Sequence, residues 1–153
     1  MKPATISVRS RHLDEIAEAL PQRASELSHI FLTRSSVCVS RTEVGVLRRL
    51  SVGPRRISEL AADERVTQPA ITLLVNRLEE RGWVRRAADP RDRRAVLVGL
   101  TPAGEKALAR LRAEYRSLLH EEMEGLDDHE VETLARAVQI LDGLIEQLTD
   151  RPG

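Results

Sequence analysis

The chain of 153 residues has few aromatic side chains, a single cysteine and no long apolar run. Aromatic residues make up 2% of it, so any core must be built from aliphatic side chains. One cysteine excludes a disulfide framework within the chain and agrees with a reducing compartment. The chain lacks both an apolar run of about 18 residues and a signal-peptide pattern. These absences predict a cytoplasmic protein of one domain without a membrane partner.

Catalytic and metal-binding patterns are missing as well. The four histidines are scattered: His12, His29, His120 and His129. No His-Glu-x-x-His pair, glycine-rich phosphate loop or nucleophile elbow occurs. Glu26, His29 and Cys38 are suitable ligand types, but their spacing has no tight-site signature. We therefore expect no catalytic residue, no cofactor and no metal, and an enzyme is the weaker alternative.

Charge is unevenly distributed although its sum is zero. Residues 41–100 hold 13 arginines and 8 acidic residues, whereas residues 101–153 hold 6 basic and 12 acidic residues. Residues 1–40 are nearly neutral, with 5 basic and 4 acidic side chains. A basic middle region is the electrostatic footprint expected of a nucleic-acid-binding surface.

Residues 67–82 have the pattern of a helix with one apolar side. Four aliphatic residues recur at helical spacing: Ile71, Leu74, Val75 and Leu78. Thr67 is a good N-cap, Pro69 is tolerated in the first turn, and Gly82 suits a left-handed C-terminal cap. The stripe has to pack inward, so the opposite face points outward.

That outward face carries side chains able to contact base edges: Thr67, Gln68, Thr72, Leu73, Asn76 and Arg77. Glutamine and asparagine can pair with adenine, and arginine can pair with guanine or phosphate. An ordinary amphipathic surface helix is the plainer interpretation. The preceding segment argues against it, because residues 57–64 form a short predicted helix capped by Ser58. A short helix, a tight link and a second helix make a helix-turn-helix.

A basic hairpin follows this helix pair. Two β-prone runs, residues 83–86 and 95–100, flank a charged tip that begins with Asp89-Pro90. Asp92 is expected to hold Arg94 in an extended pose through a bidentate pair. A solvated hairpin end without function is the alternative for this arginine cluster.

These segments resemble the MarR family of bacterial winged-helix transcription regulators. The matching residues are 58–61, 66–72, 75–82, 89–95 and 100–104, of which Asp-Pro-x-Asp-Arg-Arg in the hairpin is the most specific. The resemblance implies a mainly α fold with a small β-hairpin wing, in one domain spanning 1–153. Its expected regions are N-terminal dimerisation (1–39), a winged helix-turn-helix (40–100) and C-terminal dimerisation helices (101–153).

The resemblance also implies a function. We expect a homodimeric repressor that binds a palindromic operator in double-stranded DNA and is released by a small phenolic or lipophilic effector. Arg94 would enter the minor groove with Asp92 as its orienter, while Arg91 or Arg93 would meet phosphate. The expected DNA contacts are Thr67, Gln68, Pro69, Thr72, Asn76, Arg77, Arg91, Asp92, Arg93 and Arg94.

Two positions depart from the family pattern. The link of the helix-turn-helix usually carries Leu-Gly where this chain has Glu64-Arg65. An arginine there costs free energy if the position needs a positive φ. The recognition helix often has an arginine where this chain has Leu73, which indicates a different operator preference.

The flanking segments predict long helices with apolar seams. Ser40 to Glu43 form a capping box, and Gly53-Pro54 is expected to end the helix that the box opens. Thr101 with Pro102 starts a long helix, and Asp127 caps the last one. Pro21 is expected to kink or break the first helix. The seam residues expected at the dimer interface are Leu13, Ile16, Leu20, Val131, Leu134, Val138, Leu141, Ile145 and Leu148. Packing within one chain is the alternative.

Two further alternatives concern function. A winged helix can use the same hairpin to dock another protein without binding an operator. Cys38 is the single thiol, and it would make the chain a redox-sensing regulator if it were reactive. A buried, apolar cysteine is the more common case, so we expect Cys38 to be buried.

Overall fold

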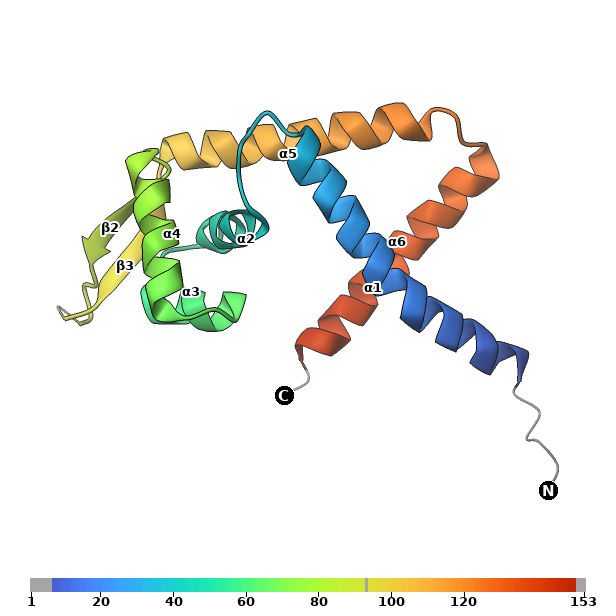
Figure 1. Cartoon of the computed structure of the whole chain (residues 1–153), viewed down its shortest axis with the longest axis horizontal. Helices are drawn as coiled ribbons and strands as arrows, with labels where there is room; N and C mark the ends of the chain where they lie inside the picture. The colour runs from blue at the N-terminus through green and yellow to red at the C-terminus, as the bar shows by residue number, and fades with distance from the viewer. Residues whose placement is uncertain (1–6, 93, 151–153) are drawn as a thin grey trace, which may run out of the picture. The chain divides into compact units, whose positions relative to one another are not determined.

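The computed structural model describes residues 7–92 and 94–150 (Figure 1). The elements along these residues are α1 (Val8–Arg34), α2 (Arg41–Leu50), β1 (Arg55–Arg56), α3 (Ile57–Glu64), α4 (Gln68–Glu80), β2 (Val84–Ala88), β3 (Val96–Leu100), α5 (Pro102–Met123) and α6 (Asp128–Thr149). The predicted class, mainly α with a small antiparallel sheet, is confirmed. The residues fall into two compact units that meet within α5, between Tyr115 and Arg116. None of the described helices has the length and apolarity to cross a membrane.

The hydrophobic core lies in the first unit and is aliphatic, as the scarcity of aromatics requires. It gathers around the helix-turn-helix, and its most deeply buried side chains are Val46, Leu47, Leu60, Ile71, Val75, Leu78, Val98 and Leu111. The apolar stripe predicted for residues 67–82 belongs to this core, because all four of its members are buried. The outward direction of the opposite face follows from that burial.

The sheet has the order β1-β3-β2, with both pairs antiparallel. Strands β2 and β3 form the predicted hairpin, in register from Val84 opposite Leu100 to Ala88 opposite Val96. The first turn of α5 packs closely against the start of β2. A Cβ on Gly104 would lie 2.1 Å from the backbone oxygen of Trp83, so only glycine fits there. The sheet is thereby joined to α5.

Several predicted helix ends are confirmed. Ser40 and Glu43 form the capping box of α2, and Thr67 caps α4. Asp127 caps α6, and the hydroxyl of Thr101 accepts a hydrogen bond from the Gly104 N–H at the start of α5. These contacts satisfy backbone donors that a helix start leaves free. Gly82 adopts φ +72°, as expected for the residue that ends the recognition helix.

Other predictions about helix breaks, ends and caps were wrong. Helix α1 runs unbroken through Pro21, because losing one backbone donor leaves the hydrogen bonds on both sides in place. Helix α2 ends at Leu50, before Gly53-Pro54. Helix α3 spans Ile57–Glu64 as predicted, but its N-cap is Arg56 and not Ser58, and Glu59 accepts a hydrogen bond from the Arg56 backbone N–H at 2.7 Å. The two-residue strand β1 was not foreseen.

Arg65 adopts the left-handed conformation expected for the family's glycine position, with φ 54° and ψ 42°. Its N–H still donates to the carbonyl of Ala62 at 3.2 Å, so the end of α3 closes normally. The turn therefore keeps its shape, although a left-handed arginine there costs conformational free energy.

Candidate nucleic-acid interface

Helix α4 presents an exposed face opposite its buried stripe. Thr67, Gln68, Pro69, Thr72, Leu73, Asn76 and Arg77 are all exposed. The predicted outward direction of these residues is confirmed residue by residue. An α-helix with a free polar face fits the DNA major groove in width.

Asn76 is held by the wing, a connection that sequence reasoning missed. Its side-chain oxygen accepts a hydrogen bond from the Arg86 guanidinium of β2 at 2.6 Å. The same guanidinium pairs with Glu79, whose carboxylate also accepts from the Arg86 backbone N–H at 3.1 Å. Because the oxygen faces Arg86, the amide N–H₂ of Asn76 is left to donate outward. No spacing rule signals this contact, since it depends on how β2 lies beside α4.

Two other side chains of the face have partners of their own. The hydroxyl of Thr72 donates to the backbone oxygen of Gln68 at 2.8 Å, within the helix. The Arg77 guanidinium leans towards the buried Glu43 of the α2 capping box, with Nε 3.9 Å from the carboxylate. The side chain of Arg77 remains 61% exposed, so a DNA phosphate or base can still reach it.

The wing tip is tied to the lobe by Asp89, whose residue surface is only 6% exposed. One carboxylate oxygen accepts from the Arg56 guanidinium at 2.6 and 3.1 Å. The other accepts from the Arg91 backbone N–H at 2.8 Å. These bonds, led by the one from Arg91, hold the pKa of Asp89 below its ordinary value, and the pKa of Arg56 is raised by the same pairing. The link joins β1 to the tip across 33 residues of sequence.

The predicted Asp92–Arg94 side-chain pair is not among the ion pairs of residues 7–92 and 94–150. Asp92 instead accepts the Arg94 backbone N–H at 3.1 Å, as an aspartate closing a turn does. Its other oxygen lies 3.8 Å from the Arg56 guanidinium. Asp89 is thus the acidic residue that holds an arginine side chain, and that arginine comes from β1. Arg91 and Arg94 are exposed at the tip, and Arg93 lies outside the described residues.

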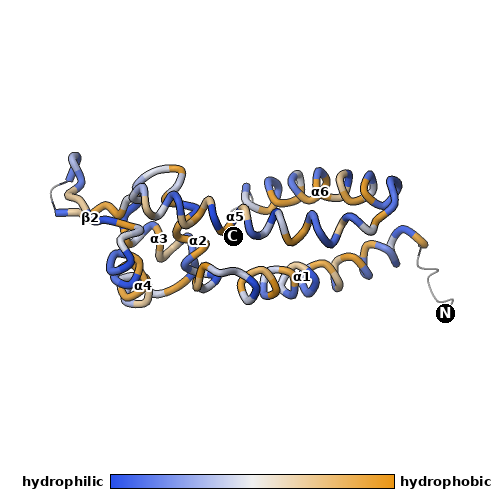
Figure 2. Tube along the Cα trace, turned by 90° about the horizontal axis from the view of Figure 1, so that it is seen from above, coloured by the Kyte–Doolittle hydropathy of each residue, from blue (hydrophilic) through white to orange (hydrophobic). Residues whose placement is uncertain are grey.

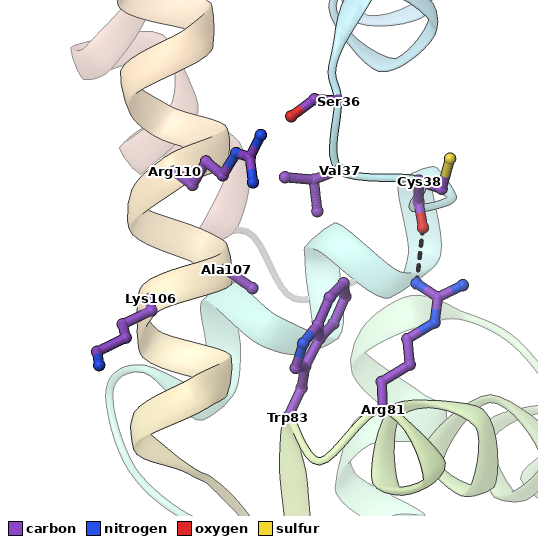
Figure 3. A pocket seen from close by; sticks show the side chains of 8 residues that line it. All are labelled: Ser36, Val37, Cys38, Arg81, Trp83, Lys106, Ala107 and Arg110. Carbon is purple, nitrogen blue, oxygen red and sulfur yellow. Dashed lines mark hydrogen bonds between the residues drawn. The ribbon is translucent and has the colours of Figure 1, made fainter.

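A pocket of about 450 Å³ opens beside the joint between α4 and β2 (Figure 3). Its lining residues are Ser36, Val37, Cys38, Arg81, Trp83, Lys106, Ala107 and Arg110. The Arg81 guanidinium donates to the Cys38 carbonyl at 2.6 Å and lies 5.0 Å from the centre of the Trp83 ring. Arg81 is thus the cation that lies against the indole, and Lys106 and Arg110 are the other cationic residues of the lining. Cys38 is exposed, so the expectation of a buried cysteine was wrong.

One wall of this pocket is fixed by Glu114 of α5. Its carboxylate accepts from the hydroxyl of Ser36, from that of Ser35 at 2.7 Å, and from the Ser36 backbone N–H at 3.0 Å. These hydrogen bonds, the Ser36 hydroxyl first, lower the pKa of Glu114 to about 2. The carboxylate also accepts from Arg110 at 3.1 Å. The linker after α1 is therefore held against α5 by a group that stays charged at physiological pH.

We predict that Asp89→Asn weakens DNA binding by roughly five- to tenfold at fixed salt, because it loosens the tip from Arg56. Loss of a negative charge near DNA would alone tighten binding. Asp92→Asn is the matched control, since it removes the same charge from the tip while both hydrogen bonds from Arg56 to Asp89 stay in place, and it should bind equally or more tightly. Fluorescence anisotropy measures both, and equal behaviour of the two variants would contradict the anchoring role.

The lowered pKa of Asp89 also sets the pH range of that comparison. The tie is complete above the ordinary carboxyl pKa near 4 and is lost only as pH falls through the lowered value. Assays near neutral pH therefore compare fully charged Asp89 with its neutral replacement.

Comparison with known proteins agrees with this architecture. Residues 39–96 match the MarR family. The chain is 31% identical over 105 residues to the uncharacterized HTH-type transcriptional regulator YpoP of Bacillus subtilis, covering 68% of this chain and 74% of the relative. It is 29% identical over 96 residues to the HTH-type transcriptional repressor IacR of Pseudomonas putida, covering 63% and 58%.

A solved structure leads to the same assignment. Wild-type MarR of E. coli in its apo form superposes with a TM-score of 0.65 at 26% identity, over 84% of this chain and 96% of that one. Regulators of this kind bind DNA and are not enzymes. From the winged helix-turn-helix, the matched segment and these relatives together, the chain belongs to the MarR family of HTH-type transcriptional regulators.

Proposed function

We propose that this regulator is a homodimeric repressor, which binds a palindromic operator and is released by a small organic effector. The observation that carries the proposal is the pairing of an exposed polar face on α4 with an anchored arginine-bearing wing. A helix of this kind reads the major groove while a basic wing reaches the backbone or minor groove. The name of the Pseudomonas putida relative supports repression.

Substitution of Gln68 tests whether α4 reads base edges in the operator. The Gln68 side chain is exposed at the first residue of α4, where recognition helices contact base edges. After an operator is selected from a random duplex pool, Gln68→Ala should lose about 1–3 kcal/mol on the operator and little on random DNA. Arg91→Ala is the control, because a phosphate contact should weaken both duplexes alike and lower the salt slope. Equal weakening by Gln68→Ala on both duplexes would contradict base reading.

The same titration decides between DNA and protein as the partner. Binding through phosphates falls steeply as salt rises. A winged helix that docks another protein would show no salt-sensitive binding to duplex DNA and would select no consensus from the pool. This outcome would favour the protein-interaction alternative.

Exposed apolar side chains on α1 and α6 support the dimer. On α6 the predicted seam residues Val131, Leu134, Val138, Ile145 and Leu148 are exposed, and Leu141 is half-buried. On α1, Leu13 and Ile16 are exposed and Leu20 is half-buried. Figure 2 shows apolar segments recurring along both helices. Such seams in a single chain mark surfaces that another chain covers.

We predict that Leu141→Asp combined with Ile145→Asp separates the dimer, because two unpaired charges would be buried in the seam at a cost of several kcal/mol. Operator affinity should fall with it, since two recognition helices about one DNA turn apart are needed to span a palindrome. Gln139→Asp adds a charge to an exposed position of the same helix and should leave the dimer intact. Light scattering that reports a full dimer for the double variant would contradict an interface at this seam.

The pocket beside Trp83 is the effector site that we propose. Its volume falls in the range of small-ligand pockets, about 300–1,000 Å³. Arg81, Lys106 and Arg110 supply positive charge, while the indole and Val37 supply an apolar surface. This combination favours an aromatic acid among the phenolic or lipophilic effectors that the family resemblance implies.

Trp83 is the only tryptophan of the chain, so its fluorescence reports this pocket directly. We predict that an aromatic carboxylate such as benzoate or salicylate changes the Trp83 emission and lowers operator affinity over the same concentration range. Arg110→Gln should weaken this ligand binding by about tenfold. Arg112→Gln, on an exposed position of the same helix, should not. Release from the operator with unchanged Trp83 emission would place the effector elsewhere.

A further inference from the structure

Leu73 is an apolar side chain in the middle of the DNA-facing surface of α4. Its surface is 64% exposed, although four other apolar residues of the same helix are buried. Successive helix residues are about 100° apart. Leu73 therefore lies on the far side of α4 from Ile71 and Val75, which are fully buried. Its exposure is a consequence of the way the core orients the helix.

The neighbours of Leu73 along the face add to this apolar character. Pro69, one turn earlier, is also exposed and carries no hydrogen-bond donor. The hydroxyl of Thr72 donates to the Gln68 carbonyl within the helix, so its proton is not available to a base. Asn76, one turn later, keeps its amide N–H₂ for outward donation because its oxygen accepts from Arg86. The centre of the face thus offers an apolar group flanked by one oriented donor.

The major-groove group that best matches an apolar side chain is the C5-methyl group of thymine. Base pairs otherwise present hydrogen-bond donors and acceptors along that edge. A leucine pressed against the other edges would strip them of water without replacing the hydrogen bonds. Contact with a thymine methyl instead removes two apolar surfaces from water.

We propose that Leu73 is a specificity-determining residue that reads a thymine methyl group near the centre of each operator half-site. This inference rests on the proposed reading of an operator by α4. The inference requires a thymine at a defined position of each half-site. An operator read by an arginine in place of Leu73 would not need that thymine.

The test replaces single thymines of the selected operator with uracil, which removes the methyl group and leaves the base-pairing edge unchanged. The full chain should lose about fourfold in affinity at one thymine of each half-site. Leu73→Ala should bind the thymine and uracil operators equally at that position, whereas Leu73→Met should keep the difference. Thr72→Ala removes the rival methyl group on the adjacent residue, which can also contact a thymine methyl, and should keep the difference. Selection with Leu73→Arg should replace the thymine preference with guanine.

Each result has a definite meaning. The inference is supported if the sensitivity to uracil disappears in Leu73→Ala and persists in Thr72→Ala. Sensitivity that persists in Leu73→Ala, or that disappears in Thr72→Ala, overturns it, as does the absence of any uracil-sensitive thymine. A pool that yields no consensus for the unmodified chain would overturn the proposed operator binding itself. Because these failures appear at different steps, they can be told apart.

Discussion

Burial of one side of α4 is the constraint on which the interface depends. Ile71, Leu74, Val75 and Leu78 enter a core made of aliphatic residues from several other elements. Removing any one of them would open a cavity at a cost of about 2–5 kcal/mol for a leucine or isoleucine cut to alanine. The helix therefore has one allowed rotation about its axis, and the residues that face outward do so without further support. The recognition surface is thus a product of the packing.

The wing needs a different kind of support, because its strands are short and its tip is highly charged. Among the described residues of the two hairpin strands, Val84 and Val98 are fully buried and Leu100 packs partly buried against the core. Beyond them the tip is positioned by charged hydrogen bonds, from Arg56 to Asp89 at the tip and from Arg86 to Asn76 and Glu79 beside α4. Charge-assisted bonds are stronger and more directional than neutral ones. Arg56 and Arg86 are engaged in these bonds, so they are less available to DNA than their charge alone suggests.

These two kinds of support, hydrophobic burial for α4 and charged hydrogen bonds for the wing, explain which features the sequence predicts. The elements built on local rules were predictable: the stripe of α4, the caps at Ser40, Thr67 and Asp127, and the hairpin. Contacts that depend on strand register or on how two elements meet were not. The Arg56–Asp89 pair joins residues 33 apart, and a two-residue strand such as β1 has no periodicity to detect. The orienting role was assigned to Asp92, because the sequence shows that an acid lies near the tip arginines but not which of two acids faces a partner.

A ligand in the proposed effector pocket would act on α4 and on the wing together, because the pocket lies where they join. Trp83 stands between the end of α4 and the start of β2, and its backbone oxygen accepts from the Thr101 N–H at 3.0 Å, next to the start of α5. A ligand against the indole would therefore touch the joint from which helix and wing both extend. It can release DNA only if it binds more tightly to an arrangement of that joint which does not fit the operator. Gly104, pressed against the backbone of Trp83, leaves little space for small adjustments there. A closely packed joint transmits a shift instead of absorbing it, which makes this site better placed for control than a pocket of equal size on a free surface.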